Sequence, residues 1–246
     1  MIAGSHGGIS SGRYAAQLGL RGVVLDDAGV GKDEAGIESL PYLNDLGLPA
    51  AAVDNETARI GDGVSMSQGV VSHVNDLAAD CGCEPGQAAI DCAAAMSDAG
   101  VDPVRADVDS ELTRKQVTDG GTPVWTLDSI GQISGDHEGA IIVTGSHGER
   151  FAGEFDSYVR ADVAGITLFD AGVGKDDAGI GRLRTMNDRG IPAATVDVDS
   201  ARIGDSTSAL DTGVVSHVND LASALGVAPG DSCSSFVETV RDAVDG

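Results

Sequence analysis

The chain has 246 residues, of which 41% are hydrophobic, and a formal net charge of −24. So negative a chain repels nucleic acid phosphates and anionic lipid, and no apolar run approaches the roughly 18 residues of a membrane helix. We therefore predict a globular protein with no nucleic-acid or membrane partner. The start "MIAGSHGG" lacks a basic region followed by an apolar one, so we expect an unsecreted, cytoplasmic protein.

The acidic residues are scattered along the whole chain, and lysine occurs at only three positions, Lys32, Lys115 and Lys175. An acidic surface that attracts a cationic partner is one interpretation. Scattered acidic residues without a terminal acidic block are more typical of a halophilic composition, in which high salt screens the repulsion between charges. The charge then reflects an acidic proteome and says nothing about chemistry.

Short apolar strands alternate with helices over the first 100 residues. Strands are predicted at Ile2–Ala3, Gly22–Leu25 and Pro49–Asp54. Apolar residues near helical spacing predict helices over residues 34–45, 69–82 and 87–99. Continuous apolar strands between helices are typical of a parallel sheet in a three-layer α/β/α arrangement.

The same pattern returns in the second half of the chain. Gly22–Asp62 and Gly165–Asp205 align without a gap and share 26 of 41 residues, and Gly69–Ala78 recurs whole at Gly213–Ala222. The predicted fold is α/β, with two tandem repeats of a three-layer unit at residues 1–100 and 139–246. We expect a pseudo-two-fold pair, like an ancestral homodimer, and leave further oligomerisation open.

Residues 101–138 have no counterpart in the other copy. The stretch "TPVWTLDSIGQIS" is rich in β-forming residues and contains Trp125, the only tryptophan, so one or two strands are predicted there. This connecting segment is expected either to complete the second sheet or to tie the two copies together.

Polar residues that both copies keep lie where the predicted strands end. Because ligands bind at the carboxyl ends of strands in open α/β sheets, three successive strands are expected to bring these residues to one edge. The candidate catalytic residues are His6, Asp27, His147 and Asp170. The candidate substrate-binding residues are Lys32, Asp54, Arg59, Lys175, Asp197 and Arg202.

Each candidate has a chemical interpretation and a structural one. His6 and His147 titrate near neutral pH and could act as acid and base, or could cap turns through their ring nitrogens. Arg59 could clamp a substrate carboxylate, or could bridge to Asp62 and fix its own loop. No cofactor is predicted, and a divalent metal in the Asp-rich cleft is left open.

The segment "DAGVGKD" occurs at Asp27–Asp33 and again at Asp170–Asp176. A Gly-rich turn with a lysine between strand and helix is similar to a phosphate-binding loop. Asp27 replaces the first glycine of that motif and Asp33 replaces its Ser/Thr, which argues against nucleotide hydrolysis. An anion site remains one interpretation, and a tight turn in which Asp33 caps the following helix is the other.

The remaining reactive residues give weaker signals. Ser5 adjoins His6, but neighbours on an extended chain point apart, which disfavours a Ser–His dyad. His73 and His217 lie beside an apolar stripe and are more typical of a partly buried histidine than of a metal ligand. Cys81 and Cys83 correspond to Leu225 and Val227 in the second copy, so thiol chemistry is not required at those positions.

The order of these motifs resembles that of caspase-like cysteine peptidases. The matching residues are "SHGG" at Ser5–Gly8 with "LDDAG" at Leu25–Gly29, and "SHGE" with "LFDAG" at Leu168–Gly172, about a third of each copy. The resemblance implies the topology and the place of the site. The nucleophilic cysteine falls at Gly29 and Gly172, so thiol peptidase activity is not implied.

Two functions follow from these patterns. The first is an enzyme, a hydrolase or lyase/isomerase, that acts on a small polar, carboxylate-bearing metabolite by His/Asp acid–base chemistry with Lys and Arg holding the anion. Each site could borrow residues from the other copy. The alternative is a non-catalytic metabolite-binding or scaffold protein. The enzyme hypothesis expects His6, Asp27 and Arg59 to converge on one cavity.

Overall fold

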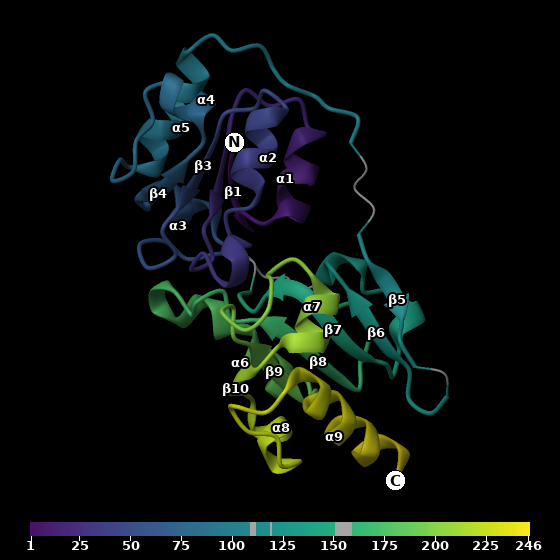
Figure 1. Cartoon of the computed structure of the whole chain (residues 1–246). Helices are drawn as coiled ribbons and strands as arrows, with labels where there is room; N and C mark the ends of the chain where they lie inside the picture. Colours follow the sequence, from purple (N-terminus) through teal and green to yellow (C-terminus); the bar gives the residue numbers. More distant parts are fainter. Residues whose placement is uncertain (109–111, 119, 151–158) are drawn as a thin grey trace. The chain divides into compact units, whose positions relative to one another are not determined.

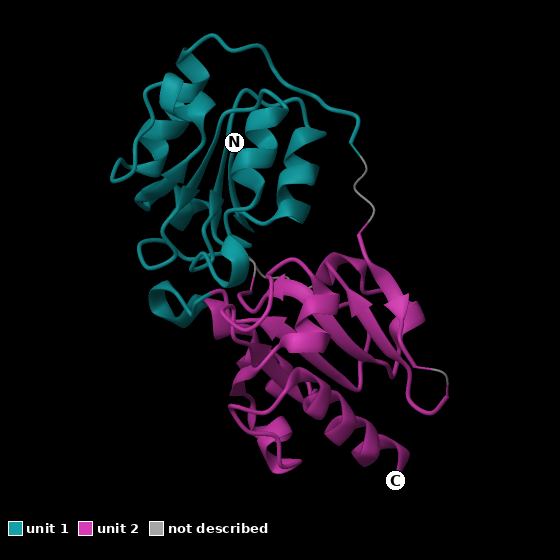
Figure 2. Ribbon diagram, in the orientation of Figure 1, with its two compact units in different colours: residues 1–111, 172–178 teal, residues 112–171, 179–246 magenta. Residues whose placement is uncertain are grey.

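A computed structural model describes residues 1–108, 112–118, 120–150 and 159–246. The chain forms two compact units (Figure 2). Unit 1 contains residues 1–111 together with 172–178, and unit 2 contains residues 112–171 and 179–246. The second copy of the "DAGVGKD" segment therefore lies for the most part in unit 1, with the first copy.

The sheet of unit 1 has the strand order β1-β2-β3-β4 (Figure 1). Its first three strands are parallel, and β4 runs antiparallel to β3. Every residue of β2 and β3 is buried, as expected for a sheet covered on both faces. The strands are β1 (Ile2–His6), β2 (Val23–Asp26), β3 (Ala50–Val53) and β4 (Val71–Val74).

Helices cover both faces of this sheet. Leu40 and Leu43 of α2 pack with Leu25 on one face, whereas Met66 of α3 and Met96 of α5 pack with the opposite face. The α/β class with three layers is therefore confirmed for this unit. Its helices are α1 (Ile9–Ala16), α2 (Ser39–Asp45), α3 (Gly63–Gln68), α4 (Asp76–Asp80) and α5 (Ala89–Asp98).

Unit 2 repeats this order and extends it. Its sheet has the order β10-β9-β8-β7-β6-β5, in which β6 to β9 are parallel and the two outer strands are antiparallel to their neighbours. The connecting segment thus supplies two strands, β5 and β6, that complete the second sheet. The strands are β5 (Arg114–Gln116), β6 (Val124–Leu127), β7 (Ile141–His147), β8 (Gly165–Phe169), β9 (Ala193–Val196) and β10 (Val215–Val218).

The helices of unit 2 also lie on both faces of its sheet. Leu183 and Met186 of α6 belong to the core on one face, and α7 and α9 contact the sheet with the buried Phe236 and Val240. The α-helices are α6 (Arg182–Asp188), α7 (Ser206–Thr212), α8 (Asp220–Ala224) and α9 (Cys233–Asp245). The 3-10 helices of the chain are η1 (Lys32–Glu34), η2 (Ile130–Gln132), η3 (Gly135–His137) and η4 (Lys175–Ile180).

The helix predicted over residues 69–82 is wrong, because its first half is strand β4 and its second half is the short helix α4. Asn75 divides the two. Its side-chain oxygen accepts the N–H of Ala78 at 2.9 Å, which caps α4, and the N–H of Ala50 at 3.0 Å. The sequence "VVSHV" is rich in β-branched valine, so it fits a half-buried edge strand better than a helix.

The helix predicted over residues 34–45 begins later than expected, at Ser39. Asp33 and Glu34 adopt left-handed backbone angles, with φ of 53° and 58°, so a continuous α-helix cannot form there.

Among the described residues, no helix is long and apolar enough to cross a membrane.

Candidate functional site

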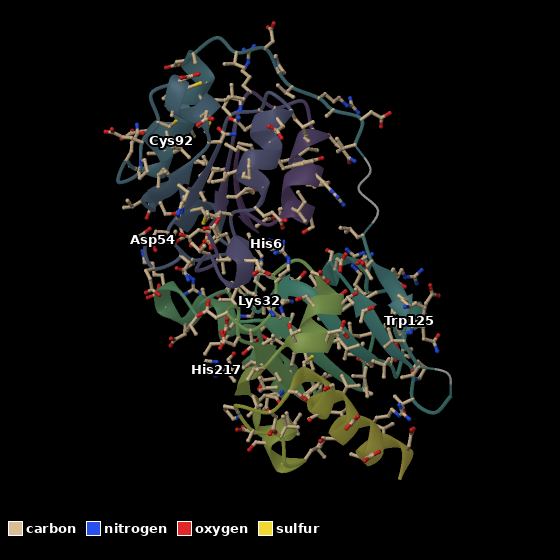
Figure 3. The ribbon with its side chains drawn as sticks, in the orientation of Figure 1. His6, Lys32, Asp54, Cys92, Trp125 and His217 are labelled. Carbon is tan, nitrogen blue, oxygen red and sulfur yellow. The ribbon has the colours of Figure 1, made fainter. Side chains whose placement is uncertain are left out.

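The carboxyl ends of the parallel strands of unit 1 carry the candidate residues, as predicted. His6 is the last residue of β1 and Asp26 the last of β2, and Asp54 directly follows β3. His6 and Asp54 are labelled in Figure 3. His6 and Asp26 are register partners on adjacent parallel strands, so their side chains project from the same face of the sheet.

The environment of His6 fixes its protonation state. Its ring is buried, and Nδ1 accepts the N–H of Gly8 at 3.1 Å. Burial lowers the pKa of His6 to about 4. Near neutral pH the imidazole is therefore neutral, and because Nδ1 accepts a hydrogen bond, the proton lies on Nε2.

Asp26 is a candidate that the sequence analysis missed. Its side chain is fully buried; Oδ1 accepts the N–H of Ala28 at 2.8 Å, and Oδ2 has no hydrogen-bond partner. Burial raises the pKa of Asp26 well above its usual value, the Ala28 hydrogen bond works in the other direction, and the charges of Asp27 and Asp54 raise it further. One signal was available: a carboxylate ends a wholly apolar strand at a position where the second copy has Phe169.

Asp27 and Asp170 brace the backbone. Oδ1 of Asp27 accepts the N–H of Gly29 at 3.0 Å and that of Asn55 at 3.1 Å, which ties the end of β2 to the loop after β3. Asp170 accepts the N–H of Val198 at 3.1 Å, the equivalent bond in unit 2. Both carboxylates are buried, and the sequence keeps them in both copies.

Asp54 and Asp197 also bond to nearby backbone. Each accepts the N–H two residues further on, from Glu56 at 2.9 Å and from Asp199 at 2.8 Å. This geometry is that of an Asx-turn, which fixes the first turn of a loop.

The first "DAGVGKD" segment has an unusual backbone. Ala28, Gly29, Val30 and Gly31 all have positive φ, between 50° and 73°, and a β-branched residue such as Val30 rarely adopts this conformation. The N–H groups of Val30 and Gly31 bond to carbonyls within the same turn. Since those of Ala28 and Gly29 bond to carboxylates, these four amides do not form an open phosphate cradle.

The second segment contributes side chains to unit 1. The N–H of Lys175 donates to the carbonyl of Asn55 at 2.8 Å, and its Nζ donates to that of Thr57 at 3.0 Å. Asp176 forms an ion pair with Arg59 at 3.7 Å between Oδ2 and Nη1. Residues from both sequence copies thus meet around the loop that follows β3.

The glycines of this region are in close contact. A Cβ added at Gly29 would lie 3.2 Å from the Cα of Gly172, and one added at Gly172 would lie 2.7 Å from Nδ2 of Asn55. Gly29 is the position at which the caspase-like resemblance places the nucleophile. A cysteine there would meet backbone and would also need a φ of +73°.

The remaining candidates, Lys32, Arg202 and Arg59, have other environments. Lys32 begins η1 and is half-buried, and the N–H of Arg202 donates to Ser208 at 3.1 Å. Arg59 is interpreted from the sequence either as a substrate clamp or as a bridge to Asp62; in the structure it forms an ion pair with Asp176, and Asp62 accepts the N–H groups at the start of α3.

In unit 2, His147 occupies the position equivalent to His6. Nδ1 of His147 accepts the N–H of Glu149 at 3.3 Å. Its register partner on β8 is Phe169, which is fully buried. Unit 2 therefore has an aromatic ring at the position of Asp26, although Glu149, two residues after His147, is also buried.

A cavity of about 400 Å³ lies in unit 1 and another of about 430 Å³ lies in unit 2. The cavity of unit 1 lies between α2 and the end of β4, near Asn44 and His73. Neither cavity is lined by His6, Asp27 or Arg59, so the convergence that the enzyme hypothesis expects is not found at either of them. Within the described part of the chain, no group of three or more His, Cys, Asp or Glu side chains is arranged to hold a metal ion.

No family model matches the chain, and no curated protein or solved structure matches it. Any assignment of function therefore depends on the geometry of the site.

Proposed function

We propose that the protein is an enzyme, a hydrolase or lyase/isomerase, that acts on a small polar, carboxylate-bearing metabolite through acid–base chemistry at His6 and Asp26. The single observation that carries this proposal is the pairing of these groups in the register at the carboxyl edge of a parallel sheet, with Oδ2 of Asp26 buried and unbonded. Two adjacent titratable groups with strongly shifted pKa values are typical of a functional site.

The proposed roles differ from those expected from the sequence. A neutral His6 with its proton on Nε2 is a hydrogen-bond donor, suited to stabilise negative charge that develops on a substrate oxygen. A protonated Asp26 is the proton donor, and its conjugate base takes the proton back. Asp27, which carries two backbone hydrogen bonds, holds the turn in place.

Arg59 and Lys175 are proposed to hold the substrate carboxylate. The Arg59 side chain is 34% exposed and its 3.7 Å ion pair with Asp176 is long, so a substrate carboxylate can replace Asp176. Because the Asp26 side chain is fully buried, the proposal requires a movement that opens the strand ends to the substrate.

A non-catalytic binding or scaffold function is the second candidate, and one observation favours it. Asp27, Asp54, Asp170 and Asp197 all accept backbone N–H groups, as loop-bracing residues do. In that case Asp26 is a buried acid without a chemical role.

The test begins with a thermal-shift screen of small hydroxy, amino and dicarboxylic acids at high salt, because a ligand that binds the native state raises the melting temperature. Compounds that bind are then followed for turnover by proton NMR. The proposal expects Asp26→Asn and His6→Gln to lose turnover by about 100-fold or more, and the matched variant His147→Gln to retain most of it. Binding without turnover, or equal losses at His6 and His147, would support the second candidate or a different site.

A further inference from the structure

Two thiols that the proposed chemistry does not use lie against each other in unit 1. Sγ of Cys83 is 2.7 Å from Sγ of Cys92, and Cys83 also contacts the carbonyl of Cys92 at 3.3 Å. Cys83 follows α4, and Cys92, which is labelled in Figure 3, lies in α5. Both are buried in the core between the sheet and its helices.

We propose that Cys83 and Cys92 are a disulfide-forming pair, so that unit 1 carries a reversible oxidation site. A disulfide has an S–S length of about 2.05 Å, so the two sulfur atoms need to approach by only about 0.65 Å. The thiol side chains already point at each other, and the bond would tie the end of α4 to the first half of α5.

The second copy shows what the same positions contain when no bond can form. Val227 replaces Cys83 and Phe236 replaces Cys92, and both of these side chains are buried. A large ring there fills the core without a thiol. The paired sulfur atoms are therefore a property of unit 1 and not a requirement of the repeated fold.

The reaction needs an oxidant, which we identify by class as a low-molecular-weight disulfide, RSSR. The Cys83 thiolate attacks one sulfur of RSSR, forms a mixed disulfide and releases RS⁻. The Cys92 thiolate then attacks the Cys83 sulfur, forms the Cys83–Cys92 bond and releases the second RS⁻. Two protons leave the protein, the two cysteines are oxidised and RSSR is reduced to two thiols.

Burial raises the pKa of both thiols, so the thiolates are scarce while the loop before α5 is closed. Exchange is therefore expected to be slow and to follow the opening of this loop. Gly82 and Gly86, both with positive φ and open space around them, flank Cys83 in that loop.

The test uses the full chain and oxidised glutathione as the probe. After incubation, peptide mapping by mass spectrometry without reduction should find the Cys83 and Cys92 peptides joined, and reduction should separate them. The melting temperature should rise by about 5 °C on oxidation, since the bond restricts the unfolded chain. Cys83→Ala and Cys92→Ala should abolish both effects, and Cys81→Ala and Cys233→Ala should keep them.

The mapping on the wild-type chain decides the matter even where a variant fails to fold. A glutathione adduct without a cross-link, a bond that joins Cys81 to either partner, or no reaction in the native state at any pH up to 9 would each overturn the proposal.

Discussion

Unit 1 and unit 2 share their order of strands and their bracing residues, yet differ at the end of the second strand. Asn75 and Asn219 cap equivalent helices, and Asp27 and Asp170 accept equivalent backbone N–H groups. Beside the histidine at the end of the first strand, however, unit 1 has the buried acid Asp26 and unit 2 has Phe169.

This difference distinguishes residues that the fold requires from residues for which we propose a chemical role. Residues that fix loops and caps occur in both units, because each loop has backbone groups that need partners. The carboxyl group at the end of the second strand and the Cys83–Cys92 pair occur in unit 1, whereas unit 2 has Phe169, Val227 and Phe236 at those positions. Apolar side chains fill the core of unit 2 at these positions, so packing alone does not explain why unit 1 has a carboxyl group and two thiols there.

The largest effects should come from glycines that both units need. A Cβ at Gly7 would overlap the carbonyl of Gly36, and one at Gly148 would overlap that of Gly179. Gly7→Ala and Gly148→Ala should each destabilise their own unit by about 4 kcal/mol. Gly135→Ala, where the new methyl group meets nothing within 4 Å, is the matched control and should change the free energy of unfolding by less than about 0.5 kcal/mol.

The readout can separate the units, because Trp125, the only tryptophan, lies in unit 2. Denaturant unfolding followed by Trp fluorescence reports unit 2, and amide hydrogen exchange in β1 to β3 reports unit 1. Equal losses of protection in both units for each single variant would contradict the idea that the units have separate cores.

The pH dependence of unit 1 should change when His6 is replaced. Its folded pKa of about 4 lies below the unfolded value of 6.5, so the unfolded chain binds more protons between these values and stability rises with pH across that window. The free energy difference between wild type and His6→Gln should therefore grow by about 3 kcal/mol from pH 4 to pH 6.5. A difference that stays constant across the window, measured by hydrogen exchange in β1 to β3, would show that His6 is not buried as described.

Asn75→Ala and Asn219→Ala should have similar, intermediate effects. Asn75 bonds to the N–H groups of Ala50 and Ala78 and to the carbonyl of Leu48, and Asn219 makes the equivalent bonds in unit 2. Each substitution should cost about 2 kcal/mol in its own unit, because buried backbone groups lose their partners. Denaturant unfolding followed by Trp fluorescence for unit 2 and by hydrogen exchange for unit 1 measures both costs, and a loss for only one of the two variants would contradict the equivalence of the caps.

The smallest effect is expected at Arg59. Its ion pair with Asp176 is 3.7 Å long and both side chains are partly exposed, so Arg59→Ala should cost about 0.5 kcal/mol or less. Thermal denaturation across a series of salt concentrations should show this small cost disappearing as salt rises. A loss of several kcal/mol that persists at high salt would show that Arg59 is structurally essential.

Much of the fold was predictable from the sequence, because continuous apolar strands such as Gly165–Phe169 have a clear signature. The strand β4 was not, since "VVSHVNDLA" has apolar residues that suit a helix stripe as well as a strand. The hydrogen bonds of Asn75 to Ala50 and Leu48, which are distant in the sequence, separate β4 from α4.

The sequence predicted that polar residues lie at the strand ends, but not the environment of each side chain. The strand ends brought His6, Asp27 and Asp54 to one edge, as periodicity implied. Asp26 and Asp27 are both buried, but Asp27 accepts two backbone N–H groups whereas Oδ2 of Asp26 has no partner, and this difference arises from the packing around each carboxylate. Similarly, the contact between Cys83 and Cys92 arises from packing between α4 and α5, which spacing along the chain does not encode.

The central claim is that unit 1 holds a neutral carboxylic acid at Asp26 beside a neutral histidine. A carbon-13 NMR titration of the aspartate carboxyl groups, with Asp26→Asn to assign the signal, measures this directly. The Asp26 carboxyl should stay protonated at pH values at which the exposed aspartates are ionised, since its pKa is raised well above the usual value by burial. A titration of Asp26 together with the exposed aspartates, near pH 3.8, would contradict it.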